Sequence, residues 1–256
     1  MGTDVLKALV DAGHEVVAVD MITRELPGYD GKFTPVVANV TDKEAVKGTC
    51  DGADVVITTV GLTKTSATLT NYDVDYNGNI NILNEALAKG VKHFTYISVI
   101  DADKAPDVPM LDAKAQVEKV LKGSDIEWVI HRPTGYFYDI AHIFMPMVEK
   151  GKVSLLGKGD KKCNVVDTPD FASFIVKHML DHNQTYEVGG QETYTYVEIA
   201  DMFAKAAGKQ IKVSFAPTWL FDILIFVNKL KKNGKDAIIK FSKWTLTHDL
   251  VGKDVA

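Results

Sequence analysis

Residues 1–20 read MGTDVLKALVDAGHEVVAVD, and this stretch decides the fold class. Residues 3–12 are predicted to form a helix, because capping residues stand at the start and valines and leucines recur at helical spacing. Gly13 follows, where a helix end favours a left-handed residue. Residues 14–19 are a valine-rich run typical of a buried parallel strand, and Asp20 ends it. Helix, glycine, buried strand and acid indicate the second half of a βαβ dinucleotide-binding unit.

The first half of such a unit, a strand and a glycine-rich turn, is missing before residue 1. We therefore expect an N-terminally shortened form of a longer protein that begins at Met1, inside the glycine motif. In the usual strand order the missing strand is central, so the strands ending at Asp20 and Val60 should not pair with each other. Direct pairing of these two strands would contradict this expectation.

The rest of the chain continues to alternate strands and helices with short connections, which is typical of a parallel sheet covered on both faces. Further strands are expected within 33–42, 53–61, 93–99 and 126–133, and helices within 42–52, 73–88 and 110–123. From Gly135 onward the segments are shorter, with a helix near Pro169 and a capping box of Thr195 and Glu198 before another. We predict an α/β fold: a Rossmann-like doubly wound parallel sheet in residues 1–134, and a smaller C-terminal substrate lobe in residues 135–256 that is interleaved with the sheet.

Size and charge exclude some classes of protein. The 256 residues suffice for one α/β domain with a small lobe, and the formal net charge of −5 argues against nucleic acid as the main partner. Cys50 and Cys163 belong to no C-x-x-C pattern and are expected to be free thiols. No signal peptide is visible, so we expect a cytoplasmic protein, although a shortened chain could have lost a targeting segment.

Two further features have competing interpretations. The apolar run 219–227 is too short to span a membrane, but with the lysines up to residue 235 it could contact a membrane surface or a partner. Packing on the C-terminal lobe is the preferred interpretation of this run. His178 and His182 have the spacing of a zinc pair, yet no third ligand follows from a motif, so surface histidines are preferred and no metal is predicted.

Four stretches of the chain resemble the atypical and extended short-chain dehydrogenase/reductases of the NmrA-like and sugar-epimerase-like kind. Residues 2–20 are similar to the helix and second strand of that Rossmann unit, and ANVTD (38–42) to its Asp-Val/Leu-x-Asp, with Asn39 in place of the first acid. DVDYNGNINILNEALAKGVKHFTYISVIDAD (73–103) resembles the fourth helix and fifth strand, and KAQVEKVLKGSDIEWVIHRPTGYF (114–137) the Lys-x-x-x-Glu helix and Arg-Pro strand. The resemblance covers almost the whole chain and implies a protein that binds NAD or NADP.

The cofactor residues follow from this resemblance and from the chemistry. A helix N-terminus with Gly2 can approach the pyrophosphate closely. Asp20 can accept hydrogen bonds from ribose hydroxyls, which favours NAD, whereas Arg24 could reach a 2′-phosphate; the alternative for Asp20 is a plain turn carboxylate. Asp20 and Asn39 should border one adenosine-sized cleft. The predicted cofactor-binding residues are Gly2, Asp20, Arg24, Asn39, Val40, Thr59, Gly61, Ser98, Lys114 and Thr134.

The predicted catalytic residues are Ser98 and Lys114. The family usually has Tyr-x-x-x-Lys, but Met110 stands at the tyrosine position, and a thioether cannot transfer the proton. An isoflavone-reductase-like branch is thought to act through a lysine without this tyrosine. Tyr136 and Tyr138 could replace the phenol or simply be core aromatics.

Two functions remain open. The first is an NAD(P)-dependent oxidoreductase or epimerase that acts on a small molecule, with Ser98 polarising a carbonyl and Lys114 on the nicotinamide ribose; Lys114 could instead be a solvated lysine paired with Glu118. The second is a binding module of the NmrA kind that senses the dinucleotide or supports a complex without turnover. With either function the protein is expected to be a monomer or a homodimer. We expect the ligand pocket between Gly61, Ser98, Lys114 and Thr134.

Overall fold

A five-stranded parallel sheet forms the centre of the computed structural model, which describes residues 1–23, 25–62 and 65–256. Its strand order is β11-β8-β5-β4-β3, and all four pairings are parallel. The strands are β3 (Val55–Thr58), β4 (His93–Ile97), β5 (Glu127–Pro133), β8 (Gln184–Gly189) and β11 (Asp254–Val255). The predicted Rossmann-like fold class is therefore confirmed.

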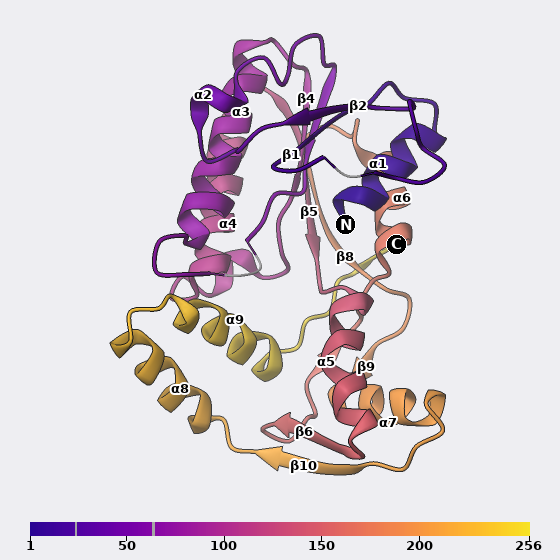
Figure 1. Ribbon diagram of the computed structural model, residues 1–256, viewed down its shortest axis with the longest axis vertical. Helices are drawn as coiled ribbons and strands as arrows, with labels where there is room; N and C mark the ends of the chain where they lie inside the picture. Colours follow the sequence, from indigo (N-terminus) through magenta and orange to yellow (C-terminus); the bar gives the residue numbers. More distant parts are fainter. Residues whose placement is uncertain (24, 63–64) are drawn as a thin grey trace.

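Helices cover both faces of this sheet, as a doubly wound fold requires (Figure 1). On one face lie α3 (Asn79–Ala88) and α4 (Pro109–Lys122), which enclose Leu83, Phe94 and Ile130 among other core residues. On the other face α1 (Gly2–Asp11) packs against α6 (Thr168–His178). The short helix α2 (Lys43–Val46), a π-helix over Tyr72–Gly78 and a 3-10 turn over Ala102–Lys104 complete this half.

The strands β1 (Val17–Asp20) and β2 (Thr34–Val37) form a separate parallel pair. Within the part of the chain that the structure describes, β1 is paired with β2 and β3 with β4, so β1 and β3 do not pair directly. The prediction that this valine-rich strand is buried is wrong, because Val17 and Val19 are 49% and 37% exposed. A strand with only one paired neighbour keeps part of its apolar surface open to solvent.

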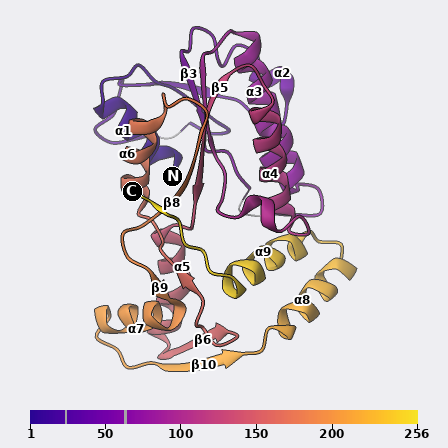
Figure 2. The ribbon, with the colours of Figure 1, turned by 180° about the vertical axis from the view of Figure 1, so that it is seen from behind.

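The C-terminal lobe lies beyond the carboxyl ends of the central strands (Figures 1 and 2). Its elements are α5 (Phe137–Glu149), β6 (Lys152–Leu156), β7 (Lys162–Cys163), β9 (Tyr194–Thr195), α7 (Tyr196–Ala206), β10 (Lys212–Ala216), α8 (Trp219–Leu230) and α9 (Lys235–Thr247). The pairs β6–β10 and β7–β9 hold it together. Because β8, β11 and α6 belong to the central layers, residues 135–256 are interleaved with the sheet.

Most predicted elements are present. The differences are that Val40 lies beyond β2 rather than in it, that the helix expected at 73–88 begins as a π-helix, and that α5, α8 and α9 were not predicted. The predicted capping box is confirmed, since Thr195 and Glu198 each accept a backbone hydrogen bond of the other. Both cysteines are free and buried.

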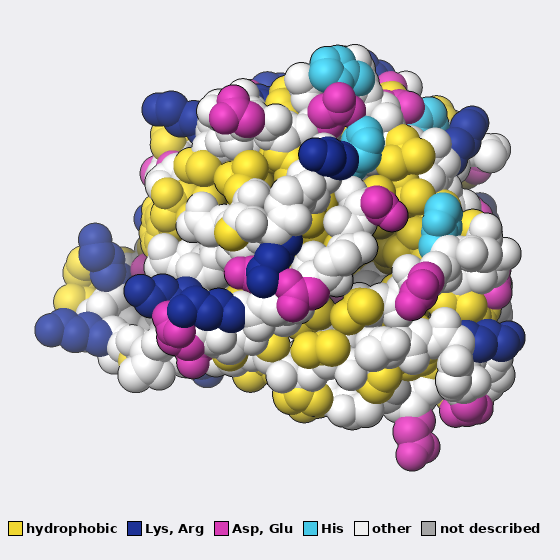
Figure 3. Space-filling view, turned by 90° about the horizontal axis from the view of Figure 1, so that it is seen from above, with side chains coloured by type: hydrophobic (Ala, Val, Ile, Leu, Met, Phe, Trp, Pro, Cys, Tyr) yellow, Lys and Arg dark blue, Asp and Glu magenta, His cyan; other side chains and the backbone are white. Residues whose placement is uncertain are grey.

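The end of the molecule opposite the lobe carries acidic, basic and histidine side chains interspersed with apolar ones (Figure 3). This face therefore lacks the single-sign basic surface typical of nucleic-acid binding. None of the described helices is both long and apolar enough to cross a membrane.

Candidate functional site

The predicted site residues follow the carboxyl ends of neighbouring parallel strands. Thr59 and Gly61 come after β3, Ser98 comes directly after β4, and Thr134 comes directly after β5. Since the strands are parallel, these positions share one edge of the sheet, the edge that faces the C-terminal lobe (Figure 1). Open α/β sheets bind their ligands at this edge.

Lys114 is held at this edge from the neighbouring helix α4. Its side chain is almost buried, at 10% exposure, and its Nζ donates to the Ile97 carbonyl at 3.2 Å. The same Nζ lies 3.4 Å from Asp75 Oδ1 and 5.4 Å from the centroid of the Tyr96 ring. Ser98 is adjacent to Ile97 in the chain, so Lys114 and Ser98 lie on the same side of the molecule, as their assignment to one site requires.

Asp75 is the acidic partner of Lys114, and the sequence analysis missed it. Asp75 is fully buried in the π-helix, and its Oδ2 accepts hydrogen bonds from the Leu62 amide at 3.2 Å and from Asn71 Nδ2 at 2.9 Å. Its Oδ1 has no hydrogen-bond partner among the described residues. Asn71, Asp75 and Asn79 are all buried and four residues apart, which is the signal that could have identified them.

Gly61 is required by this arrangement. A Cβ atom at residue 61 would lie 3.2 Å from Asp75 Oδ1 and 3.5 Å from Lys114 Nζ. A larger residue would therefore push against the ion pair. Asn79 fixes the preceding turn, because its Nδ2 donates to the Val60 carbonyl at 3.3 Å while its Oδ1 accepts from Thr58 Oγ1 at 2.7 Å.

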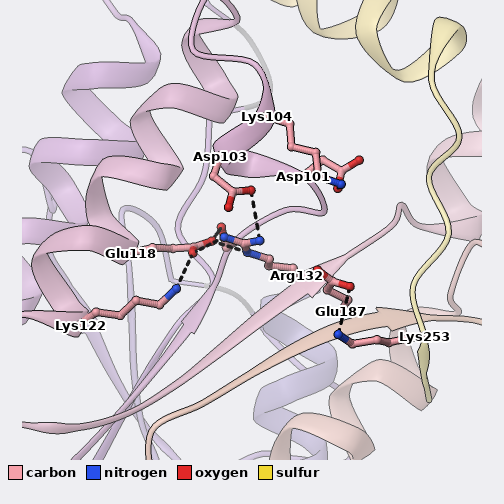
Figure 4. A network of polar contacts seen from close by, with 9 residues as sticks. Asp101, Asp103, Lys104, Glu118, Lys122, Arg132, Glu187 and Lys253 are labelled. Atoms are coloured by element: carbon pink, nitrogen blue, oxygen red, sulfur yellow. Dashed lines mark hydrogen bonds and ion pairs between the residues drawn. The ribbon is translucent and has the colours of Figure 1, made fainter.

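Ser98 belongs to the ionic network around the buried Glu118 and Arg132. Figure 4 shows these two residues with Asp103 and Lys122. The Ser98 Oγ donates to Glu118 Oε1 at 2.6 Å, and Arg132 contacts both Glu118 oxygens, through Nε at 2.9 Å and Nη2 at 2.7 Å. Arg132 also reaches Asp103 at 3.2 Å, and Lys122 reaches Glu118 at 3.3 Å. The Ser98 proton is thus directed at Glu118, and it could polarise a substrate carbonyl only after leaving that carboxylate.

The alternative interpretation of Lys114 as a partner of Glu118 is wrong. Although the two residues are four apart on α4, Glu118 is bound by Arg132 and Lys122, and Lys114 is paired with Asp75. The reason is geometric: Arg132 presents two parallel donors to the carboxylate, which a single ammonium cannot match.

The nucleoside end of the predicted site lies at α1, β1 and β2. Gly2 opens α1, and a Cβ there would lie 3.0 Å from Thr59 Oγ1, so these two predicted residues are adjacent. Asp20 Oδ1 accepts from the Met21 amide at 2.6 Å, and the Asp20 carbonyl accepts from the Ala38 amide at 2.9 Å. The carboxyl ends of β1 and β2 are thereby held side by side. A shared adenosine cleft for Asp20 and Asn39 stays a prediction.

Two other predicted residues in this region have defined backbone roles. Asn39 Oδ1 accepts from the Thr41 amide and hydroxyl at 3.1 and 2.9 Å, and the Val40 carbonyl accepts from Asn81 Nδ2 at 2.9 Å. Both interactions shape the turn after β2. Arg24 lies outside the described residues.

Two cavities lie further along the same edge, after β5 and β8. One has a volume of about 440 Å³ and includes Asp167, Asp170 and Gly190; the other, of about 390 Å³, includes Tyr194, Ile199 and Met202. Phe137, Val165 and Gln191 line both. The expected position between Gly61, Ser98, Lys114 and Thr134 is not where these cavities lie, because Lys114 and Asp75 fill the space beside Gly61.

Thr134 connects the sheet edge to these cavities. Its Oγ1 donates to the Asn164 carbonyl at 2.8 Å, and Asn164 precedes Val165 in the cavity wall. Tyr136 packs against Phe171 in the hydrophobic core, with ring centroids 6.1 Å apart. The exposed Tyr138 contacts the His142 ring, with centroids 4.1 Å apart and the ring planes tilted by 42°. The two tyrosines therefore have the roles of a core aromatic and a surface aromatic.

The predicted histidine pair contacts acidic side chains, and both cysteines are buried. His178 Nδ1 lies 2.7 Å from Asp181, and burial raises the pKa of the Cys163 thiol to about 11. Within residues 1–23, 25–62 and 65–256, no cluster of His, Cys, Asp and Glu is arranged to hold a metal ion.

A family model described as NAD(P)H-binding matches residues 1–182, which is well over half of the chain and contains α1, Gly61, Ser98 and Lys114. The chain belongs to this NAD(P)H-binding family. Photosystem II assembly factor Ycf39 of Synechocystis is 25% identical over 85% of this chain and 68% of that protein. For Ycf39 of Trieres chinensis the shared region is 48% of the relative, so the chain spans only part of the length of these relatives, from 48% to 68%.

Solved structures of this NAD(P)H-binding kind have the same fold. The NADPH-dependent quinone oxidoreductase QOR2 of Escherichia coli, complexed with NADPH, has a TM-score of 0.73 at 21% identity, covering 96% of this chain and 85% of that one. The triphenylmethane reductase of Citrobacter, complexed with NADP(H), has a TM-score of 0.74 at 15% identity over 97% and 87% of the two chains. The predicted family resemblance is confirmed, and NAD and NADP are not distinguished by it.

The residues at the sheet edge fit such a dinucleotide. An ammonium has three N–H donors, and among the described residues Lys114 donates one of them to the Ile97 carbonyl while it forms an ion pair with Asp75. Lys114 therefore keeps donor capacity for a ligand hydroxyl. The buried Asp75 Oδ1, 3.4 Å from Lys114 Nζ, holds the ammonium at this edge.

Proposed function

We propose that this protein is an NAD(P)-dependent oxidoreductase that reduces a small apolar carbonyl or quinone-like compound. The observation that carries the proposal is Lys114, a nearly buried cation fixed by Ile97 and Asp75 at the carboxyl edge of a dinucleotide-binding sheet. A buried, paired lysine at such an edge is a functional-site feature, because its desolvation has to be offset by specific interactions.

The chain's own residues would bind and orient the reactants. Bound NAD(P)H supplies the hydride. Lys114 would hold the nicotinamide ribose through an N–H that Ile97 does not accept, and Asp75 would keep Lys114 in place. Ser98 would act through Glu118, by holding the carboxylate that anchors Arg132 beneath the strand ends.

The substrate class follows from the two cavities. Their volumes of about 440 and 390 Å³ suit a small molecule, and Phe137, Ile140 and Met202 give an apolar surface for a flat ring. Gln191 in both walls can orient a carbonyl oxygen through its amide.

The cofactor preference is proposed to be NAD. Asp20 ends β1 beside the turn after β2, where a carboxylate accepts hydrogen bonds from ribose hydroxyls and repels a 2′-phosphate. Asp20→Ala should therefore weaken NADH binding relative to NADPH by about tenfold, as a lost charged hydrogen bond implies. An unchanged ratio of the two dissociation constants would count against this role.

Turnover tests the proposal directly. NADH and NADPH oxidation should be followed with a panel of quinones and aromatic carbonyls, using the wild type, Lys114→Met and the matched control Lys119→Met, which changes an exposed lysine of the same helix. We expect turnover with at least one quinone, a loss of about a hundredfold or more for Lys114→Met, and a normal rate for Lys119→Met.

The second candidate is a dinucleotide-binding module without turnover. It is favoured by Met110 at the usual tyrosine position and by Ser98, whose proton is given to Glu118. A relative is a photosystem II assembly factor. Tight binding of NAD(P)H with no oxidation across the panel would support this candidate and reject the first.

A further inference from the structure

Helix α8 presents its most apolar side to solvent. Trp219, Ile223, Phe226 and Leu230 are 56%, 50%, 61% and 66% exposed. Their spacing of four, three and four residues places them in one line along the helix. We call these four residues the apolar stripe. In α8, which the structure describes throughout, no residue is buried.

Positive charge gathers at one end of the apolar stripe. Between residues 219 and 235 the sequence has four lysines and a single acid, on a chain whose net charge is −5. Lys229, Lys231, Lys232 and Lys235 are all exposed, whereas the acid, Asp222, is 2.5 Å from Lys243 Nζ. The local charge around the stripe is therefore opposite to that of the whole protein.

The turn that follows α8 is in contact with residues of the central domain. The turn between α8 and α9 is fixed at Gly234, where φ is +73° and a Cβ would lie 2.2 Å from the Ser66 carbonyl oxygen; Thr65 Oγ1 donates to the Gly234 carbonyl at 2.7 Å. In both ribbon views, α9 lies between α8 and the half of the molecule that contains the central sheet (Figures 1 and 2).

The second helix of this pair, α9, anchors α8 to the central domain. Phe241 and Trp244 of α9 pack on the small core cluster at α4, and Lys240 Nζ donates to the Asp107 carbonyl at 3.0 Å. The helices α8 and α9 are therefore attached to the central domain at two places, the turn at Gly234 and the helix α9. The apolar stripe is exposed although its helix is anchored in this way.

We propose that the apolar stripe docks on the surface of an anionic lipid bilayer. A helix of 12 residues is about 18 Å long, so it would lie in the plane of the interface with Trp219 and Phe226 at the acyl boundary. The four lysines would contact anionic headgroups. A convex apolar ridge bordered by lysines fits a fluid anionic surface, and such a contact is distinct from the dinucleotide site.

The test uses the full chain and needs no turnover. Co-sedimentation with vesicles of phosphatidylcholine and phosphatidylglycerol should be compared with pure phosphatidylcholine vesicles. We expect binding to the anionic vesicles alone, weakening as salt is raised. Ile223→Ser with Phe226→Ser should lower partitioning by about tenfold or more. Leu180→Ser is the matched control. Leu180 is similarly exposed, at 55%, but it lies just after α6 and far along the chain from the apolar stripe.

A second pair of variants separates charge from apolar contact. Lys231→Glu with Lys232→Glu should lower partitioning on anionic vesicles, whereas Lys150→Glu with Lys152→Glu, which changes two exposed lysines of the lobe, should not. Trp219 emission should shift to the blue on vesicle addition, and Trp219→Phe should remove the shift. Each variant should bind NADH as the wild type does, which shows that it is folded.

Two outcomes overturn the proposal. Equal partitioning of the stripe variant and the Leu180 control would show that α8 does not make the contact. Absence of vesicle binding, together with a dimer in sedimentation velocity that Phe226→Ser dissociates, would assign the stripe to a second copy of this chain. Both outcomes leave the dinucleotide proposal untouched.

Discussion

The buried Glu118 accepts hydrogen bonds from the buried Ser98 and Arg132 and forms an ion pair with the more exposed Lys122. Glu118→Ala would leave the Arg132 guanidinium without its bidentate partner. We expect the free energy of unfolding to fall by about 3 kcal/mol or more, as for other broken buried ion pairs. Urea denaturation measures this, with the exposed Glu44→Ala as control, where a loss under about 1 kcal/mol is expected. If Glu118→Ala and Glu44→Ala lowered the free energy of unfolding by similar amounts, the network around Glu118 would not be a major source of stability.

His131 makes stability depend on pH. Burial, with a smaller effect of nearby His178, lowers its pKa from 6.5 to about 3. At pH values between these two, the unfolded chain binds a proton that the native chain does not, so stability falls as the pH falls below the unfolded value. Asp181 acts in the opposite direction, and His178 also faces the ring. We expect a loss of about 2 kcal/mol from this group between about pH 7 and pH 5.

His131→Phe should remove that part of the pH dependence. A phenyl ring can keep the stack on Tyr186 and the edge contacts with Phe171 and Phe174. Urea denaturation at several pH values should give a shallower slope for the variant below about pH 6.5. Parallel slopes for the two proteins would show that His131 is not responsible.

Individual residues differ in how far the sequence predicts them. Lys114 and Ser98 could be placed at the sheet edge because family motifs specify their positions. Asp75 could not, since its contact with Lys114 depends on the π-helix that turns it inward. The choice of Arg132 over Lys114 as the partner of Glu118 likewise depends on three-dimensional geometry that spacing along α4 does not contain.

At the scale of elements, the helix α7 is stabilised at its start by the capping box of Thr195 and Glu198. Thr195→Ala removes an acceptor for the first turn, and we expect it to cost about 1 kcal/mol in the free energy of unfolding. Ser173→Ala, which changes an exposed hydroxyl bonded within α6, serves as the control and should cost less. A larger loss for Ser173→Ala than for Thr195→Ala would contradict the capping role.

Elements were predictable where the helical periodicity is clear, as for α4, or where a capping box marks the start, as for α7. The burial of β1 was not, because a valine run gives no information on whether a second neighbour strand is present. The helix α5 was missed because Pro146 lies inside it and aromatic residues crowd its first turn, which masks the usual periodicity.

At the scale of the whole molecule, the two proposals concern separate places, the sheet edge beside the lobe and helix α8. The proposed dinucleotide site lies at the carboxyl edge of the central strands, and Phe137, Val165 and Gln191 line two cavities after β5 and β8. Helix α8 lies at the rim of the molecule (Figure 1). The fold class could be predicted because alternating strands and helices with short connections allow few topologies. The cavity position could not, because it depends on how β8 and the Val165 segment meet.

The central claim is that Lys114 holds a nicotinamide dinucleotide at the carboxyl edge of the sheet. The most direct measurement is the dissociation constant of NADH and NADPH, from nicotinamide fluorescence, for the wild type, Lys114→Met and Lys119→Met. We predict that Lys114→Met weakens binding by about tenfold to a hundredfold, the range of one lost charged hydrogen bond, while Lys119→Met binds normally. Thermal unfolding should confirm that both variants are folded. Equal dissociation constants for the wild type and a folded Lys114→Met protein would contradict the claim.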